Sequence, residues 1–187
     1  MTRLVEYMES APGKVVWTAT DHRSIEGRLM AAGMIFERWP LHAEINSESE
    51  ADQVLAVYKD EIDRLVRARG YQLVDVLKIR ADMDNLDELK HKFAKEHTHV
   101  EDEVRFFVEG KGTFWLHLYD QVIKLECEAG DLLVVPHGTR HWFEIPDDPA
   151  RGGPHYTAIR LFIDPHGWEA HYTGTATAEE FLEKAAA

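Results

Sequence analysis

The segment His97-Thr-His99-Val-Glu-Asp-Glu103-Val-Arg105-Phe-Phe-Val-Glu-Gly110 decides how this 187-residue chain is interpreted. Alternate side chains of an extended strand share one face of a sheet. If extended geometry holds through the segment, the odd-numbered polar residues project to the same side: His97, His99, Glu103 and Arg105. Two imidazoles and a carboxylate that converge in this way are typical ligands of a divalent transition metal. The segment therefore predicts a metal site on one face of a sheet.

A second segment, Pro136-His-Gly138-Thr-Arg-His141-Trp-Phe143, offers a fourth ligand, His141, after a tight turn. Three imidazoles and one carboxylate fill four of six octahedral positions and leave two for water or substrate. Cys127 is the only cysteine, so a thiolate-based structural zinc site and an internal disulfide are both excluded. The ligand types leave iron, nickel, cobalt, manganese and zinc open.

Short alternating segments follow the first motif and are separated by Gly, Asp and Pro. They cover residues 104–109, 113–118, 121–127, 132–135, 142–145 and 157–163. Strands this short at near-regular spacing predict an antiparallel sandwich or barrel.

The N-terminal part alternates between helical and extended patterns. Helices are expected over 24–33, 49–69 and 86–95, strands over 34–39 and 71–79, and a further short helix after residue 176. Ser47 and Glu50 are expected to form a capping box for the second helix. We expect a mainly β (α+β) chain forming one domain over residues 1–187. Residues 1–95 would pack on a small antiparallel β-barrel or jelly roll (96–173), followed by a tail (174–187).

Charge and hydropathy exclude several classes of function. The chain holds 21 Lys and Arg against 34 Asp and Glu, a net charge of −13, so a nucleic-acid partner is not expected. No apolar run is long enough to span a bilayer, and no secretory signal is recognised at the N-terminus. With the lone cysteine, these features favour a cytoplasmic protein without a membrane partner.

Arg105 and Arg160 raise a question of charge balance. Arg105 shares the expected ligand face, and Arg160 alternates with apolar residues in Thr157-Ala-Ile-Arg160-Leu-Phe162. A guanidinium inside a small barrel needs an anionic partner. An Asp or Glu of the chain and a substrate anion both meet that need, so the residues alone leave the two alternatives open.

The two motifs resemble those of the cupin superfamily. His97, His99, Glu103 and Gly110 match its first motif, His-x-His-x3-Glu-x6-Gly. Gly130, Pro136, Gly138 and His141 match its second, Gly-x5-Pro-x-Gly-x2-His. Two conventional positions differ, since His91 and Ile145 stand where the superfamily has glycine and asparagine, but neither position is a ligand. The resemblance implies a cupin-type barrel with helices on its N-terminal side.

A more specific resemblance covers nearly the whole chain. Glu96-His-Thr-His99 and Glu101-Asp-Glu-Val-Arg-Phe-Phe-Val-Glu-Gly110 are similar to the acireductone dioxygenase family of the methionine salvage pathway. Phe36-Glu-Arg-Trp39, Gly70-Tyr71, Ala158-Ile-Arg-Leu-Phe162 and Gly167-Trp168 agree with it. The chain departs from the family pattern in its 146–155 loop and in placing His137 within the second motif. These departures leave undecided how a substrate would reach the pocket.

The resemblance implies a set of roles for residues of this chain. His97, His99, Glu103 and His141 would bind one Fe²⁺ or Ni²⁺ per chain, and Arg105 would orient the bound enediolate. Asp102 would assist proton transfer, although a solvated turn carboxylate is an equal alternative. Phe93, Phe143, Arg160 and Trp168 would line the pocket, with a plain core role as the alternative for the aromatic residues.

The resemblance also implies a reaction, in which 1,2-dihydroxy-3-keto-5-methylthiopentene combines with O2. The iron form would give formate and 4-methylthio-2-oxobutanoate. The nickel form would give carbon monoxide, formate and 3-methylthiopropanoate. Bacterial relatives imply a monomer.

Two other interpretations remain open from the sequence. One is a different metal-dependent cupin enzyme, such as a sugar isomerase or a manganese oxidase of small acids. The other is a binding or regulatory cupin that is stabilised by metal and does not turn over. Arginines on pocket-facing positions favour small-anion chemistry over both.

Overall fold

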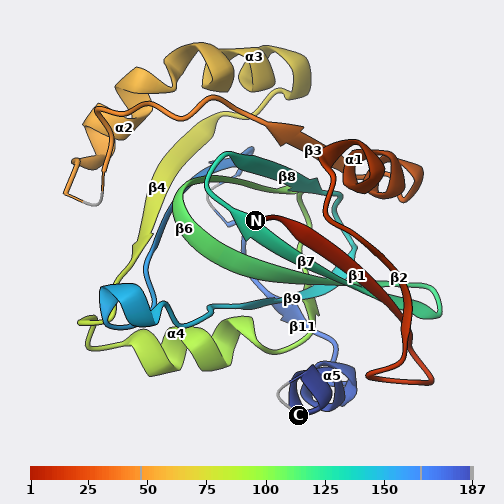
Figure 1. Cartoon of the computed structure of the whole chain (residues 1–187). Helices are drawn as coiled ribbons and strands as arrows, with labels where there is room; N and C mark the ends of the chain where they lie inside the picture. The colour runs from red at the N-terminus through yellow and green to blue at the C-terminus, as the bar shows by residue number, and fades with distance from the viewer. Residues whose placement is uncertain (47, 165, 186–187) are drawn as a thin grey trace.

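The computed structural model describes residues 1–46, 48–164 and 166–185 and shows a strongly curved antiparallel sheet with helices around it (Figure 1). In the described residues the strands are β1 (Arg3–Met8), β2 (Val15–Ala19), β3 (Ile35–Arg38), β4 (Leu73–Ile79), β5 (His97–Thr98), β6 (Glu103–Leu118), β7 (Gln121–Glu128), β8 (Asp131–Val135), β9 (Arg140–Glu144), β10 (Tyr156–Phe162) and β11 (His171–Tyr172). The helices are α1 (His22–Ala31), α2 (Ala51–Val57), α3 (Lys59–Arg69), α4 (Leu86–Phe93) and α5 (Thr177–Ala185), with a short 3-10 helix η1 (Pro149–Arg151). The expected mainly β class is confirmed.

Strand β6 joins the two halves of the sheet. Its first half pairs with β8 and β10, and its second half pairs with β7 and β9. The strand bends at Gly110, whose φ is +78° and where a Cβ would lie 2.0 Å from the carbonyl oxygen of His155. Only glycine meets both conditions, so the cupin-motif glycine fixes the curvature. The sheet is not closed. Its main order of hydrogen-bonded neighbours, β11-β5-β9-β6-β7-β1-β2, begins and ends at different strands.

The space inside the curve is filled by aromatic rings. Phe107, Phe114, Phe143 and Tyr156 are buried, and the ring centres of Phe114 and Phe143 lie 4.9 Å apart. Edge-to-face packing of this kind adds to the free energy gained by burying apolar area. The cluster forms an apolar layer beneath the part of the sheet where β5, β6 and β9 carry the two histidine motifs.

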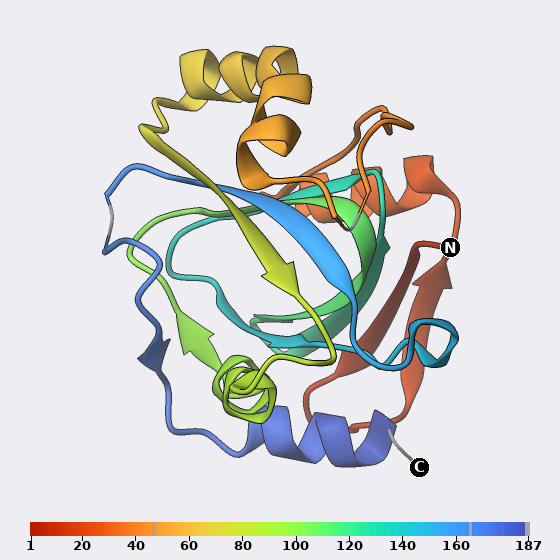
Figure 2. The same cartoon turned by 90° about the vertical axis from the view of Figure 1, so that its left-hand side faces the viewer.

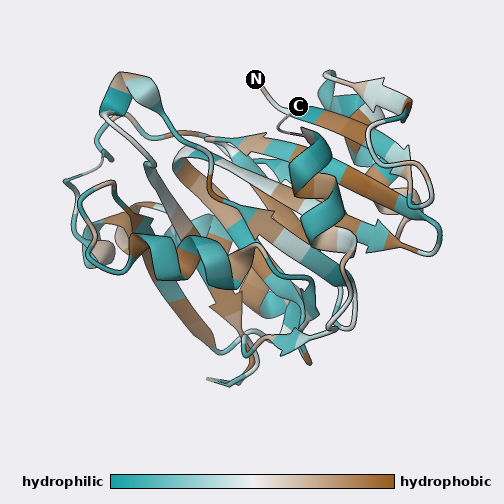
Figure 3. Ribbon diagram, turned by 90° about the horizontal axis from the view of Figure 1, so that it is seen from below, coloured by the Kyte–Doolittle hydropathy of each residue, from teal (hydrophilic) through white to brown (hydrophobic). Residues whose placement is uncertain are grey.

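Helices cover the outer faces of the sheet (Figures 1 and 2). Tyr58 between α2 and α3 packs on Phe106 of β6 at 4.9 Å, and Phe181 of α5 packs on the stacked rings of Trp115 and Trp142. The hydropathy colouring shows apolar positions on the strands and polar ones on much of the helices (Figure 3). Among the described residues, every helix is too short or too polar to cross a lipid bilayer.

Several local predictions need correction. The helix expected over 49–69 is two helices, because the backbone at Tyr58 leaves helical geometry while its ring enters the core. The capping box is formed by Glu50 and Gln53, and the predicted partner Ser47 lies outside the described residues. The segments 104–109 and 113–118 are one strand, since the bend at Gly110 does not interrupt pairing. Strands β1 and β2 were not predicted.

Candidate metal centre

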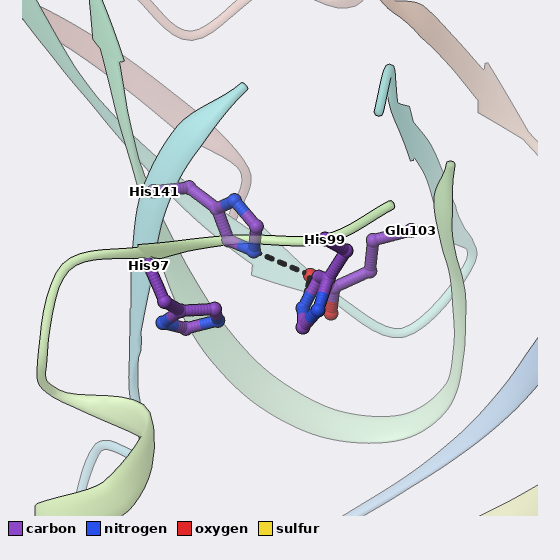
Figure 4. A group of neighbouring side chains, drawn as sticks. All are labelled: His97, His99, Glu103 and His141. Carbon is purple, nitrogen blue, oxygen red and sulfur yellow. Dashed lines mark ion pairs between the residues drawn. The ribbon is translucent and has the colours of Figure 1, made fainter. Parts of the chain in front are cut away.

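Three strands, β5, β6 and β9, and the loop between β5 and β6 bring the four predicted ligands together. His97 of β5 lies directly opposite His141 of β9, and Glu103 opens β6. One ligand atom from each of the four side chains lies within 4.8 Å of the others (Figure 4). The predicted convergence is present, but not through one continuous strand. Residues 99–102 leave the sheet, and the chain turns so that His99 reaches the group from the loop.

Backbone carbonyls fix the protonation of the three imidazoles. Nδ1 of His97 lies 2.6 Å from the carbonyl oxygen of Lys95, and Nδ1 of His141 lies 2.8 Å from that of Thr139. Nδ1 of His99 lies 2.9 Å from the carbonyl oxygen of Glu169. A carbonyl only accepts, so each Nδ1 must carry the hydrogen and each neutral ring presents a lone pair at Nε2. This is the tautomer that a metal ligand needs.

The inner atoms of the cluster require a cation. Nε2 of His141 lies 2.7 Å from Oε2 of Glu103, yet this buried nitrogen has no hydrogen bond of acceptable geometry. Nε2 of His99 lies 3.6 Å from the same oxygen. Lone pairs at this separation repel unless a proton or a metal ion lies between them. The donor set therefore fits a divalent cation with nitrogen and oxygen ligands.

Electrostatics in the metal-free cluster favour the ligand forms at two positions. Burial, with the charge of His141, lowers the pKa of His97 to about 4. Burial alone would raise the pKa of Glu103, but Arg105, His141 and His99 outweigh it and hold that pKa well below its usual range. For His99, burial is likewise outweighed by Glu103, and its pKa is raised. The shifts at His97 and Glu103 favour the forms that coordinate a metal, a neutral imidazole and an ionised carboxylate.

Arg105 is buried beside the cluster with two nitrogens unused. Its Nη2 donates to Oε1 of Glu103 at 2.6 Å, while Nε and Nη1 are buried without a hydrogen-bond partner. The guanidinium carbon lies 4.3 Å from the ring centre of Phe143, a cation–π contact. Unpaired buried donors are costly, so an anionic ligand in this cavity would satisfy them. The sequence left open whether the partner of Arg105 is a carboxylate of the chain or a substrate anion. Glu103 is such a carboxylate, but it pairs with only one of the three guanidinium nitrogens.

The cavity extends from the ligands to an apolar wall. The predicted pocket residues Phe93, Phe143 and Trp168 all line it, together with Phe162 and Lys92. Including its open mouth, the cavity holds about 610 Å³, a size suited to a small metabolite. A polar, cationic end and an apolar end match a substrate with an anionic head and an apolar tail.

Two other predicted residues, Arg160 and Asp102, line the same cavity and differ in their hydrogen-bond partners. Arg160 donates from Nε and Nη2 to Asp75 at 2.8 and 2.5 Å, so its charge already has a partner within the chain. Asp102 lines the cavity and accepts a hydrogen bond from the backbone nitrogen of His137 at 3.0 Å. The side chain of His137 is 74% exposed and lies outside the ligand cluster.

The sequence did not predict the residues that support the ligands. Glu96 is buried and accepts hydrogen bonds from His117 at 2.6 Å and from Thr173 and Thr175, which ties β5 to the C-terminal segment. Glu101 accepts hydrogen bonds from two backbone nitrogens more than sixty positions further along the chain. The only signal for Glu101 was its place within an acidic run, which a solvated surface explains equally well.

Comparison with known proteins agrees with this geometry. The model of the ARD/ARD' family matches residues 16–170. The chain belongs to this family. Acireductone dioxygenase 2 of Pectobacterium atrosepticum is 44% identical over 181 residues, covering 97% of each chain. Acireductone dioxygenase of Enterobacter sp. strain 638 is also 44% identical, covering 97% of this chain and 98% of its own. The prediction of a dioxygenase of the ARD/ARD' family is confirmed.

A solved structure of a family member also matches. Acireductone dioxygenase from Bacillus anthracis, with a cadmium ion in its active centre, superposes with a TM-score of 0.78 and 31% identity. The match covers 92% of this chain and 98% of the other. It confirms the predicted cupin-type fold, and with the four-residue cluster it supports a divalent metal in this ARD/ARD' chain.

Proposed function

We propose that this ARD/ARD' chain catalyses the reaction of 1,2-dihydroxy-3-keto-5-methylthiopentene with O2 at the centre formed by His97, His99, Glu103 and His141. The observation that carries the proposal is the shared tautomer of the three imidazoles, each held at Nδ1 by a carbonyl and presenting Nε2 inward. One Fe²⁺ or Ni²⁺ per chain would supply two open coordination positions and Lewis acidity to a chelating substrate.

Arg105 is proposed to bind the enediolate oxygens. Its unused Nε and Nη1 are buried donors on a guanidinium that contacts Glu103, and the contact with the ring of Phe143 keeps that guanidinium in place. Charge-assisted hydrogen bonds from these nitrogens would neutralise and orient the substrate. These unsatisfied donors favour a small anionic ligand over a metal that serves stability alone.

The remaining pocket residues are proposed to serve the apolar tail and proton movement. Phe93, Phe143 and Trp168 would contact the methylthio end of the substrate and exclude water from it. Asp102, which lines the cavity next to Glu103 in the chain, would accept or return a proton of the substrate. Arg160 would act indirectly, because its pair with Asp75 joins β10 to β4 beside the cavity.

The decisive experiment supplies the substrate to protein loaded separately with iron and with nickel. O2 uptake and product analysis should show formate and 4-methylthio-2-oxobutanoate with iron, and carbon monoxide, formate and 3-methylthiopropanoate with nickel. Spontaneous oxidation in buffer containing the free metal is the control. No acceleration over that control with either metal would reject the proposal. The proposed monomer and single-domain organisation can be checked on the same preparations by light scattering and by a single cooperative unfolding transition.

A further inference from the structure

One ligand of the metal centre is held differently from the other two histidines. His97 and His141 each contact the carbonyl two residues before them, so their own strands orient their rings. His99 contacts the carbonyl of Glu169, seventy positions away. The orientation of His99 therefore depends on the position of a segment that is remote in the sequence.

That part is the mouth segment, defined as residues 163–164 and 166–170, which follows β10 and borders the cavity. Gly167, Trp168 and Ala170 line the cavity wall, and Trp168 is 43% exposed at its edge. Apart from a two-residue pairing of β11 with β5 after it, the segment has no strand pairing in the described residues. Something other than the sheet must hold it against the metal ligands.

Glu101 supplies that hold. Its Oε2 and Oε1 accept hydrogen bonds from the backbone nitrogens of Ile163 and Asp164, both at 2.8 Å. Gly167 packs so closely on the same carboxylate that a Cβ there would lie 2.2 Å from Cδ of Glu101. A bidentate carboxylate on two successive amides, with glycine packed on it, fixes the start and middle of the segment.

We propose that Glu101 is a positioning residue of the metal centre. By holding the mouth segment, it places the carbonyl of Glu169 on Nδ1 of His99 and places Trp168 at the edge of the cavity. Glu101 is neither one of the four clustered residues nor one of those that line the cavity, so it acts through the segment on His99, whose carbonyl partner comes from a distant part of the chain. The inference rests on the proposed ligation by His99.

The test uses cadmium-loaded protein with ¹⁵N-labelled histidine, because cadmium is diamagnetic and leaves the ring signals visible. In Glu101→Ala, the Nδ1–H of His99 should exchange faster with water, while those of His97 and His141 stay unchanged as internal controls. Cadmium release to a chelator should become roughly ten- to a hundredfold more favourable, the usual effect of losing an outer partner of a ligand. Glu101→Gln keeps one acceptor oxygen and should restore part of both properties.

Glu169→Ala is the matched control, because the carbonyl that holds His99 belongs to the backbone and survives the substitution. It should leave the His99 signal in place. Gly167→Ala is a second variant for the case in which Glu101→Ala does not fold. Its added Cβ would collide with the Glu101 carboxylate, so it should give the same faster exchange at His99. An unchanged His99 signal in Glu101→Ala and Gly167→Ala, or equal changes at all three histidines, would overturn the proposal. Hydrogen exchange and cadmium release are both measured without turnover. A failure of the proposed reaction can therefore be distinguished from a failure of this proposal.

Discussion

Substitution of Arg105 by methionine isolates the contribution of the buried guanidinium. Methionine keeps an unbranched apolar stem in the buried site, and it removes the guanidinium, whose carbon lies over the rings of Phe114 and Phe143. The two nitrogens without a partner, Nε and Nη1, are the donors that would be lost to the substrate. Each charge-assisted hydrogen bond of this kind contributes about 1.5–3 kcal/mol. Two of them amount to about 3–6 kcal/mol, or roughly a hundredfold to ten-thousandfold in kcat/KM.

The assay follows the loss of acireductone under limiting O2 with iron-loaded protein, corrected for spontaneous oxidation. Metal content and thermal unfolding should be measured on the same samples, because Arg105 also donates to Glu103. We expect metal content to stay near one ion per chain, since the metal itself neutralises Glu103 once bound. A loss of turnover with intact metal separates substrate binding from assembly of the centre.

Arg160→Met is the matched control for this prediction. Its guanidinium already makes a bidentate pair with Asp75, so it has fewer free donors to offer a substrate. We expect kcat/KM to fall by less than about tenfold in this variant. A loss for Arg105→Met below about threefold, or equal losses in the two variants, would refute the assignment of Arg105 to the substrate.

The other predictions follow from the same contacts. Glu103→Ala should lose most of its iron by elemental analysis, since the anionic ligand is removed, whereas His137→Ala should keep full occupancy; retained iron in the first variant would point to another ligand set. Because the folded-state pKa of His97 is depressed from 6.5 to about 4, the unfolded chain binds more protons in that window. Metal-free protein should therefore lose up to about 3 kcal/mol as pH falls from 6.5 to 4, and urea titrations in chelator should show a shallower fall for His97→Gln. Gly110→Ala should lower stability by at least about 2 kcal/mol, since a Cβ would collide with a carbonyl, while Gly70→Ala, at similar φ with open space, should cost only about 1 kcal/mol; equal melting temperatures would contradict this reasoning.

The ligand set could be predicted from the sequence because it is encoded in side-chain type and spacing. His97, His99 and Glu103 lie within seven positions, and His141 follows a turn whose glycine and proline are visible in the chain. The structure brings these four side chains together, but for a reason that differs in part from the predicted one. Strict alternation fails after Thr98, and the loop through residues 99–102 delivers His99 instead.

The supports of the site could not be predicted, because they depend on register between distant segments. Arg160 meets Asp75 only because β10 and β4 pair with those two residues opposite each other. The pattern of either strand alone leaves the partner of Arg160 undecided. The carbonyl of Glu169 carries no side-chain signal at all, and its contact with His99 exists only in the folded chain.

The charges of the centre favour the proposed anionic substrate even though the protein is acidic. Glu103 and Arg105 form a neutral pair and the three imidazoles present neutral Nε2 atoms, so a bound divalent cation would keep its double charge at the polar end of the cavity. An uncompensated charge of that size is costly to bury. Water at the open positions compensates it poorly, whereas an enediolate does so directly and also satisfies Arg105. The exposed carboxylates that give the chain its net charge of −13 interact with the centre only weakly, because solvent and salt screen their charges. The local field at the centre, not the total charge, therefore decides what binds.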